Sequence, residues 1–154
     1  MSMHRVVRKA LTLTVTLDAY EAVDVVGGLL TWAVTGPGLS GLLRSVLITD
    51  DAAQSEQFTL YLFDSLPSTI ADAAAFAPTI ADLNKVACTI GIATADWTEI
   101  GEGDYALIAN YEDTQMQMPI RSDNGSIYGY LVAVDTPDYV AADDLVITLT
   151  VEVF

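Results

Sequence analysis

Cysteine and histidine are nearly missing from this sequence of 154 residues, which contains one of each, Cys88 and His4. A single cysteine cannot close an intramolecular disulfide, so a disulfide-built secreted scaffold is excluded and folding in a reducing compartment fits. His4 lies near the amino terminus, where chains commonly fray, so histidine-based catalysis and histidine-rich metal sites have almost no material. We therefore expect no enzymatic activity, no cofactor and no metal centre.

Basic residues are also scarce. Six lysines and arginines stand against 21 aspartates and glutamates, which gives a net charge of −15. Arg5, Arg8 and Lys9 precede every acidic residue, so residues 10–154 carry three cations against 21 carboxylates, a charge of −18. Such a domain repels phosphate backbones and anionic lipids, and we expect it to bind neither nucleic acid nor membranes. The acidity is also compatible with a saline environment.

Residues 1–9 are interpreted as a basic N-terminal arm. Two interpretations of this arm are open: it contacts an acidic partner or a nucleic acid, or it is only a solubilising start to the first strand. The arm is followed by one domain, residues 10–154, because a chain of this length and 52% hydrophobic content can bury a sizeable core.

Long hydrophobic runs are absent as well. No segment reaches the roughly 18 consecutive apolar residues of a membrane span, and no apolar stretch with a cleavage site follows the basic start. The sequence therefore predicts a soluble protein made in the cytoplasm. No repeat of 20 to 50 residues is present, which argues against solenoids and propellers.

The segments that are present alternate with a period of two. In residues 11–17, leucine and valine alternate with threonine, and residues 145–153 show a similar alternation of aliphatic and polar residues. This pattern is typical of half-buried strands. Short runs rich in branched and aromatic residues indicate further strands. The nine predicted strands are residues 11–17, 25–34, 42–49, 58–63, 86–92, 105–111, 117–121, 127–134 and 145–153.

Turn residues separate these strands. They are Gly36-Pro37-Gly38, Gly101 with Gly103, and Asp123-Asn124-Gly125, whose Asn-Gly pair is typical of a two-residue hairpin. Gly27-Gly28 lacks the pattern of a nucleotide-binding loop and is interpreted as a bulge or tight bend.

Residues 68–85 are rich in alanine and predict one or two short helical turns broken at Pro78, with Thr79 and Asp82 forming a cap. The whole pattern predicts an all-β fold: an antiparallel β-sandwich of the jelly-roll or a related Greek-key type, with a short helical insertion near residues 68–85.

Three carboxylate pairs and a set of aromatic residues are candidate binding groups. The pairs Asp50-Asp51, Glu112-Asp113 and Asp143-Asp144 lack the spacing of a calcium loop, so we favour solvated loop acids. Sugar-binding sandwiches use exposed aromatic rings, but rings at sheet ends are more often core edges or interface anchors. The aromatic candidates are Trp32, Trp97, Tyr20, Tyr105, Tyr111, Tyr128, Tyr130 and Tyr139. Cys88 falls inside a predicted strand, where a thiol is inert.

Several motifs resemble those of a family of small structural proteins of tailed bacteriophages. The stretch Tyr20–Gly27 has the form Y-x-A-x-D-V-V-G, Gly41–Val46 has the form G-x-x-R-S-V, and Leu60–Asp64 reads L-Y-L-F-D. The segments Pro67–Phe76, Ile127–Val132 and Thr136–Tyr139 also fit, so the resemblance covers most of the chain.

This resemblance implies a virion protein on the capsid surface, made in the host cytoplasm. The expected role is that of a decoration or cement protein, which binds the major capsid protein as a homotrimer and stabilises the particle. Other virion positions, such as a head-fibre base, neck or tail, and a carbohydrate- or receptor-binding module are alternatives. The candidate contact residues are Arg5, Arg8, Lys9, Tyr20 and Trp32.

Overall fold

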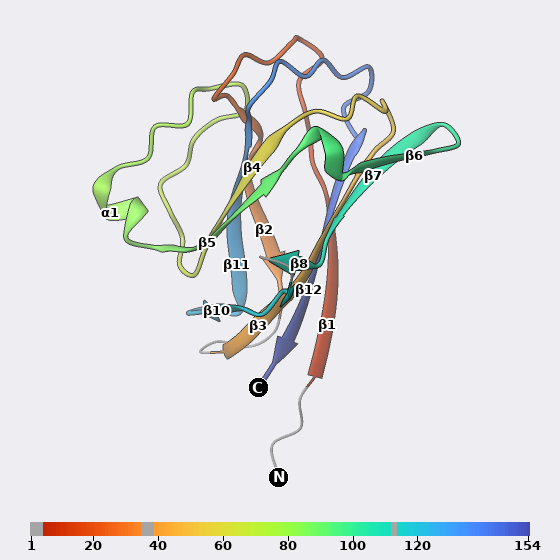
Figure 1. Ribbon diagram of the computed structural model, residues 1–154. Helices are drawn as coiled ribbons and strands as arrows, with labels where there is room; N and C mark the ends of the chain where they lie inside the picture. The colour runs from red at the N-terminus through yellow and green to blue at the C-terminus, as the bar shows by residue number, and fades with distance from the viewer. Residues whose placement is uncertain (1–4, 35–38, 112–113) are drawn as a thin grey trace.

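Two antiparallel sheets pack face to face in the computed structural model, which describes residues 5–34, 39–111 and 114–154 (Figure 1). The six-stranded sheet has the order β1 (Arg5–Thr12), β12 (Leu145–Val153), β3 (Leu39–Asp50), β7 (Gly103–Ile108) and β6 (Trp97–Ile100), and β10 (Met118–Ser122) also pairs with β3. The four-stranded sheet has the order β2 (Val25–Ala33), β11 (Ser126–Ala133), β4 (Phe58–Phe63) and β5 (Val86–Ile92). Outside the sandwich, β8 (Asn110–Tyr111) pairs with β9 (Thr114–Gln115).

The strands pair in a nested pattern. β1 pairs with β12, β2 with β11, β3 with β7 and β4 with β5, all antiparallel. β1, β2 and β3 lie alternately in the six-stranded and the four-stranded sheet, and β11 and β12 at the end of the chain alternate in the same way. This arrangement is a jelly roll, to which β6 and β10 are added. The predicted all-β sandwich is therefore confirmed.

The core lies between the two sheets. Every second residue of β12, from Leu145 to Val153, is at most 7% exposed, as the alternating pattern predicts. Trp32 of β2 crosses the core, and its indole Nε1 donates a hydrogen bond to the carbonyl oxygen of Ile147 at 3.2 Å. This bond satisfies the only polar group of a fully buried ring and joins the two sheets.

The first strand is not where the sequence predicted it. β1 spans Arg5–Thr12 rather than residues 11–17. Leu13 and Val15 are buried beyond its end, whereas Leu17 is 56% exposed. The amides of Leu13 and Val15 still donate to the carbonyl oxygens of Leu145 and Ala142, so the chain stays extended there before it turns across the end of the sandwich. The alternation therefore marked extended chain correctly but gave the wrong ends for the strand.

Other predicted elements differ in smaller ways. The run 105–111 is divided between β7 and β8, and β6 and β9 were not predicted. Of residues 68–85, only α1 (Ile80–Leu83) is α-helical, and Thr79 caps it as predicted, because its hydroxyl accepts a hydrogen bond from the Asp82 amide at 3.2 Å.

The turns also divide into confirmed and wrong predictions. Gly27 and Gly28 have φ angles of 84° and 69° beside a register shift in β11, so the predicted bulge is confirmed. The predicted hairpin at Asn124-Gly125 is wrong: this turn joins β10 in one sheet to β11 in the other, and of these two residues only Gly125 has a positive φ. Gly36-Pro37-Gly38 lies outside the described residues.

Candidate interaction surface

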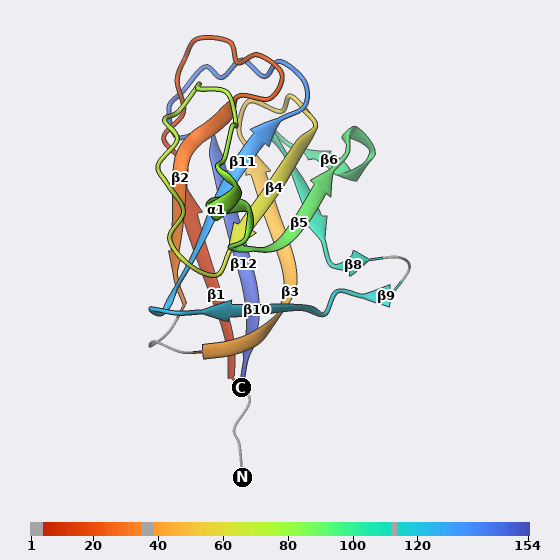
Figure 2. The ribbon, with the colours of Figure 1, turned by 90° about the vertical axis from the view of Figure 1, so that its left-hand side faces the viewer.

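The outer face of the four-stranded sheet is covered by the chain itself. The segment 64–85 between β4 and β5 lies over this face with α1, on the side away from the six-stranded sheet (Figures 1 and 2). Ile70 and Phe76 of this segment pack against a second apolar cluster. Its buried members are Val25, Phe63, Tyr128, Tyr130 and Val132.

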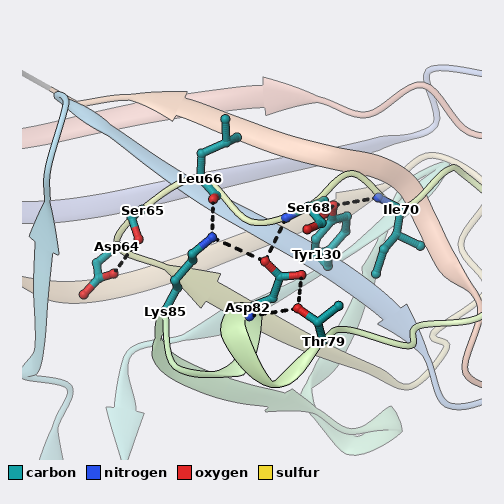
Figure 3. A network of polar contacts seen from close by, with 9 residues as sticks. All are labelled: Asp64, Ser65, Leu66, Ser68, Ile70, Thr79, Asp82, Lys85 and Tyr130. Atoms are coloured by element: carbon teal, nitrogen blue, oxygen red, sulfur yellow. Dashed lines mark hydrogen bonds and ion pairs between the residues drawn. The ribbon is translucent and has the colours of Figure 1, made fainter.

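A polar network anchors the covering segment (Figure 3). The Asp82 carboxylate accepts hydrogen bonds from the Ser68 amide and the Thr79 hydroxyl, both at 2.9 Å. The Tyr130 hydroxyl donates to the Ser68 carbonyl oxygen at 2.7 Å and accepts from the Ile70 amide at 2.9 Å. The bond from the Ser68 amide is the main reason why the pKa of Asp82 is lowered to about 2. This network is structural, and it leaves the four-stranded sheet without an open apolar face.

The outer face of the six-stranded sheet has no such cover among the described residues. Val7 and Leu11 of β1 pack on the core, so the intervening Val6, Arg8, Ala10 and Thr12 point outward. The strand register then gives two adjacent rows of outward positions without a single charge. The first row is Thr12, Val146, Thr49, Tyr105 and Thr98, and the second is Ala10, Thr148, Leu47 and Leu107.

Charge is distributed very unevenly over the molecule. Only four of the 21 carboxylates lie on described strands: Asp50, Glu99, Asp104 and Glu152. Five of the six cations lie on strands of the six-stranded sheet: Arg5, Arg8, Lys9, Arg44 and Arg121. On the outer face, Glu152 pairs with Arg44. The outer face of this sheet thus has an uncharged centre that is bordered by Arg8 and the Arg44–Glu152 pair, on a molecule that is otherwise strongly acidic.

Arg5, Arg8 and Lys9 do not form a separate arm. All three lie on β1, where they are register partners of Val153, Thr150 and Leu149 of β12. Residues 1–4 lie outside the described residues, and the predicted boundary after residue 9 falls inside a strand. The three side chains are exposed on an edge strand, and like charges there oppose pairing between two β1 edges. They remain available for contact, but as a rigid strand edge.

Tyr20 and Trp32 are core residues, which corrects the prediction that they contact a partner. Each is 1% exposed. The Tyr20 hydroxyl donates to the Asp72 carboxylate at 2.7 Å, which ties the covering segment to the bend before β2, and its ring packs edge-on against Tyr139. Burial raises the pKa of Tyr20 above its usual range. The alternation of Leu30, Trp32 and Val34 already indicated burial of Trp32, whereas no local signal indicates burial of Tyr20 in its loop.

The aromatic candidates for sugar binding are buried in the same way. Trp97, Tyr128, Tyr130 and Tyr139 are all at most 9% exposed, and Tyr105 is half-buried on the outer face of the six-stranded sheet. The side chain of Tyr111 lies outside the described residues. These rings therefore give a carbohydrate site no exposed platform of the kind the sequence suggested.

The acidic pairs are not simply solvated loop acids. Asp50 is 1% exposed and accepts hydrogen bonds from the amides of Ala52 and Gln54, and Asp144 is 6% exposed and accepts from the amides of Val140 and Ala141. Each holds a loop closed through backbone donors. Their neighbours Asp51 and Asp143 are exposed, as predicted. Glu112-Asp113 lies outside the described residues, and within the described ranges no three acidic, histidine or cysteine side chains are placed to hold a metal.

Cys88 is buried at 8% exposure, and burial raises the pKa of its thiol to about 12, in agreement with the predicted inert cysteine. A shallow hollow at the end of the sandwich where β3 begins is lined by Leu42, Val86 and Phe154, with Asp64 and Arg121 as its titratable residues. These residues contain no nucleophile with an adjacent base.

Comparison with known proteins identifies no family. No protein-family model matches the sequence, and no curated protein matches it beyond the level expected by chance. Among the described residues, no helix is long and apolar enough to cross a membrane.

Proposed function

We propose that this protein is a structural component of a tailed-phage virion that binds the outside of the capsid and stabilises it. The motifs in Tyr20–Gly27, Gly41–Val46 and Leu60–Asp64 support the proposal by their resemblance to small virion proteins. The jelly roll supports it by analogy, since viral capsid and lectin domains commonly have this fold. The partner is the major capsid protein, and the protein acts as a homotrimer.

The observation that carries the proposal is the uncharged outer face of the six-stranded sheet. Nine outward positions in two rows carry no charge, although 27 of the 154 residues are charged. Leu107 in this face is 54% exposed. At about 4.8 Å between strands and about 3.3 Å per residue, the whole outer face of the five strands covers roughly 600 Å², and the two uncharged rows account for roughly 300 Å² of it. The whole face approaches the roughly 800 Å² that each partner buries in a standard protein interface, so the expected contact extends past the uncharged rows to their border.

The acidic loops around this face suit the same role. A decoration protein occupies many symmetric positions, so weak contacts suffice for high occupancy. Carboxylates outside the contact repel the packaged DNA and keep free copies soluble. The contact itself is expected to be the uncharged face, with Arg8 and Arg44 at its border.

Co-sedimentation with empty capsids of the matching phage tests this proposal. Leu47→Glu and Leu107→Glu each place a charge at the centre of the expected contact, where binding to the capsid would bury it. Each substitution should therefore abolish saturable binding. Val140→Glu is the matched control, because Val140 is 80% exposed and lies in the loop before β12, outside the two rows. The proposal would be contradicted if the wild-type protein did not co-sediment with capsids. Co-sedimentation with a tail or neck fraction of the virion instead would favour another virion position.

A further inference from the structure

The two edges of the six-stranded sheet carry opposite charges. β1 forms one edge and holds Arg5, Arg8 and Lys9 without any acid. β6 forms the other edge, and the strand and its flanking turns hold Asp96, Glu99 and Glu102. The sequence contains no lysine or arginine between Val86 and Ile120, so the β6 edge has no local cation.

These charges are exposed and unpaired within the described part of the chain. Arg5, Arg8, Lys9, Glu99 and Glu102 all lie at the surface. The ion pairs that the described residues form among themselves are Arg44–Glu152, Lys85–Asp82 and Arg121–Asp123, and none involves either edge. Each edge also exposes one large apolar side chain, Val6 on β1 and Ile100 on β6, both 65% exposed.

We infer that copies of this chain associate head to tail, with the β1 edge of one copy against the β6 edge of the next. Contact between two β1 edges would bring six cations together, and contact between two β6 edges would bring six carboxylates together. Only the mixed contact pairs opposite charges and lets the open backbone groups of two edge strands meet. The charge pattern thus selects a heterologous contact and opposes both symmetric ones.

A heterologous contact repeats from copy to copy and closes into a ring when the rotation between copies permits. The inference rests on the proposed function only for the number of copies, three; the contact between copies is independent of any capsid. Because the charges are exposed, the contact should weaken strongly with salt, as the Debye length falls from about 10 Å at 0.1 M to about 3 Å at 1 M.

Sedimentation velocity of the full-length protein at low and high salt tests the contact. The wild-type protein should sediment as a trimer at low salt and shift toward the monomer as salt is raised. Arg8→Glu with Lys9→Glu should give monomers, and so should Glu99→Lys with Glu102→Lys. Combining all four substitutions reverses both edges and should restore the trimer. The control Asp18→Lys with Asp143→Lys changes the net charge by the same amount as the β6 variant at two exposed positions outside both edge strands and should leave the mass unchanged.

Far-ultraviolet circular dichroism on each variant separates lost contact from lost folding, and recovery in the combined variant cannot arise from unfolding. Wild-type protein that is monomeric at every concentration and salt would overturn the inference, as would edge variants that keep the wild-type mass. A monomer that still saturates capsids would refute the head-to-tail contact and leave the proposed function intact. A trimer that does not bind capsids would refute the proposed function and leave the head-to-tail contact intact.

Discussion

Replacing Asp50 by asparagine should remove a loss of stability that the wild-type protein suffers as the pH rises from about 4 to about 6. Asp50 ends β3 inside the sandwich, opposite its register partner Asp104. Burial raises its pKa to about 6, and the nearby carboxylates of Asp104 and Asp144 add to the increase, while the amides of Ala52 and Gln54 oppose it.

The sign follows from where the proton is bound. An aspartate in the unfolded chain has a pKa near 3.9, so between about pH 4 and 6 the folded state holds a proton that the unfolded state has released. The free energy of unfolding therefore falls as pH rises through this window. With about 1.4 kcal/mol for each pH unit, the loss is at most about 3 kcal/mol, and less where water reaches the loop.

The asparagine variant stays neutral and should show no such loss from this position. It can accept only one of the two backbone hydrogen bonds, so it should be less stable than wild type by about 1 kcal/mol at pH 4. It should equal or exceed wild type at pH 7.

Urea denaturation at several pH values measures this difference directly. Asp51→Asn is the control, because Asp51 is the adjacent residue but exposed. If the difference between Asp50→Asn and wild type were the same at pH 4 and pH 7, the assignment of a buried, proton-binding carboxyl at this position would be refuted.

Three further predictions concern the core. Gly41→Ala would place a Cβ 2.5 Å from a backbone carbonyl oxygen of β12, and it should lower the unfolding free energy measured in urea by about 1–3 kcal/mol. Gly91→Ala is the control, because nothing lies within 4 Å of a Cβ there, and it should change the unfolding free energy by less than about 0.5 kcal/mol. Equal effects of the two substitutions would contradict the close approach at Gly41. Tyr20→Phe removes the hydrogen bond to Asp72 and the one accepted from the Thr16 amide, and it should lower the unfolding free energy by about 1–2 kcal/mol; an unchanged value would show that the hydroxyl makes neither bond. Cys88 should resist a thiol-labelling reagent in the folded protein and react quickly in urea; fast labelling without urea would mean that the thiol is not buried.

The sequence predicts best the strands that are rich in branched and aromatic residues. Residues 58–63, 86–92 and 145–153 are strands with the predicted ends, because branched or aromatic side chains alternate there and turn residues flank them. β1 and β6 bury few of their residues and therefore show a weaker pattern. For this reason the sequence indicates an arm where β1 begins and no strand at β6, which exposes Glu99.

The candidate surface could be predicted only in part. The excess of acidic residues and the basic residues near the start of the sequence can be counted directly from the sequence. Their distribution over two opposite edges of one sheet depends on the strand order, which local sequence does not specify. The position of the covering segment also depends on tertiary contacts, because Ile70 and Phe76 pack against a cluster that contains Tyr128 and Tyr130 of β11. Such contacts cannot be predicted from the segment's own sequence. For the same reason the burial of Tyr20 could not be predicted from its neighbours.

The position of β12 between β1 and β3 constrains the order of events during synthesis. β1 emerges from the ribosome before the other described strands, yet its only partner in the described sheet is β12, the last of them. Until β12 is made, β1 and one edge of β3 are unpaired, and unpaired strands on neighbouring nascent chains are prone to associate. Arg5, Arg8 and Lys9 place like charges on the strand that waits longest. Like charges at these positions oppose association of unpaired β1 strands, so we expect their replacement by neutral residues to increase aggregation during synthesis.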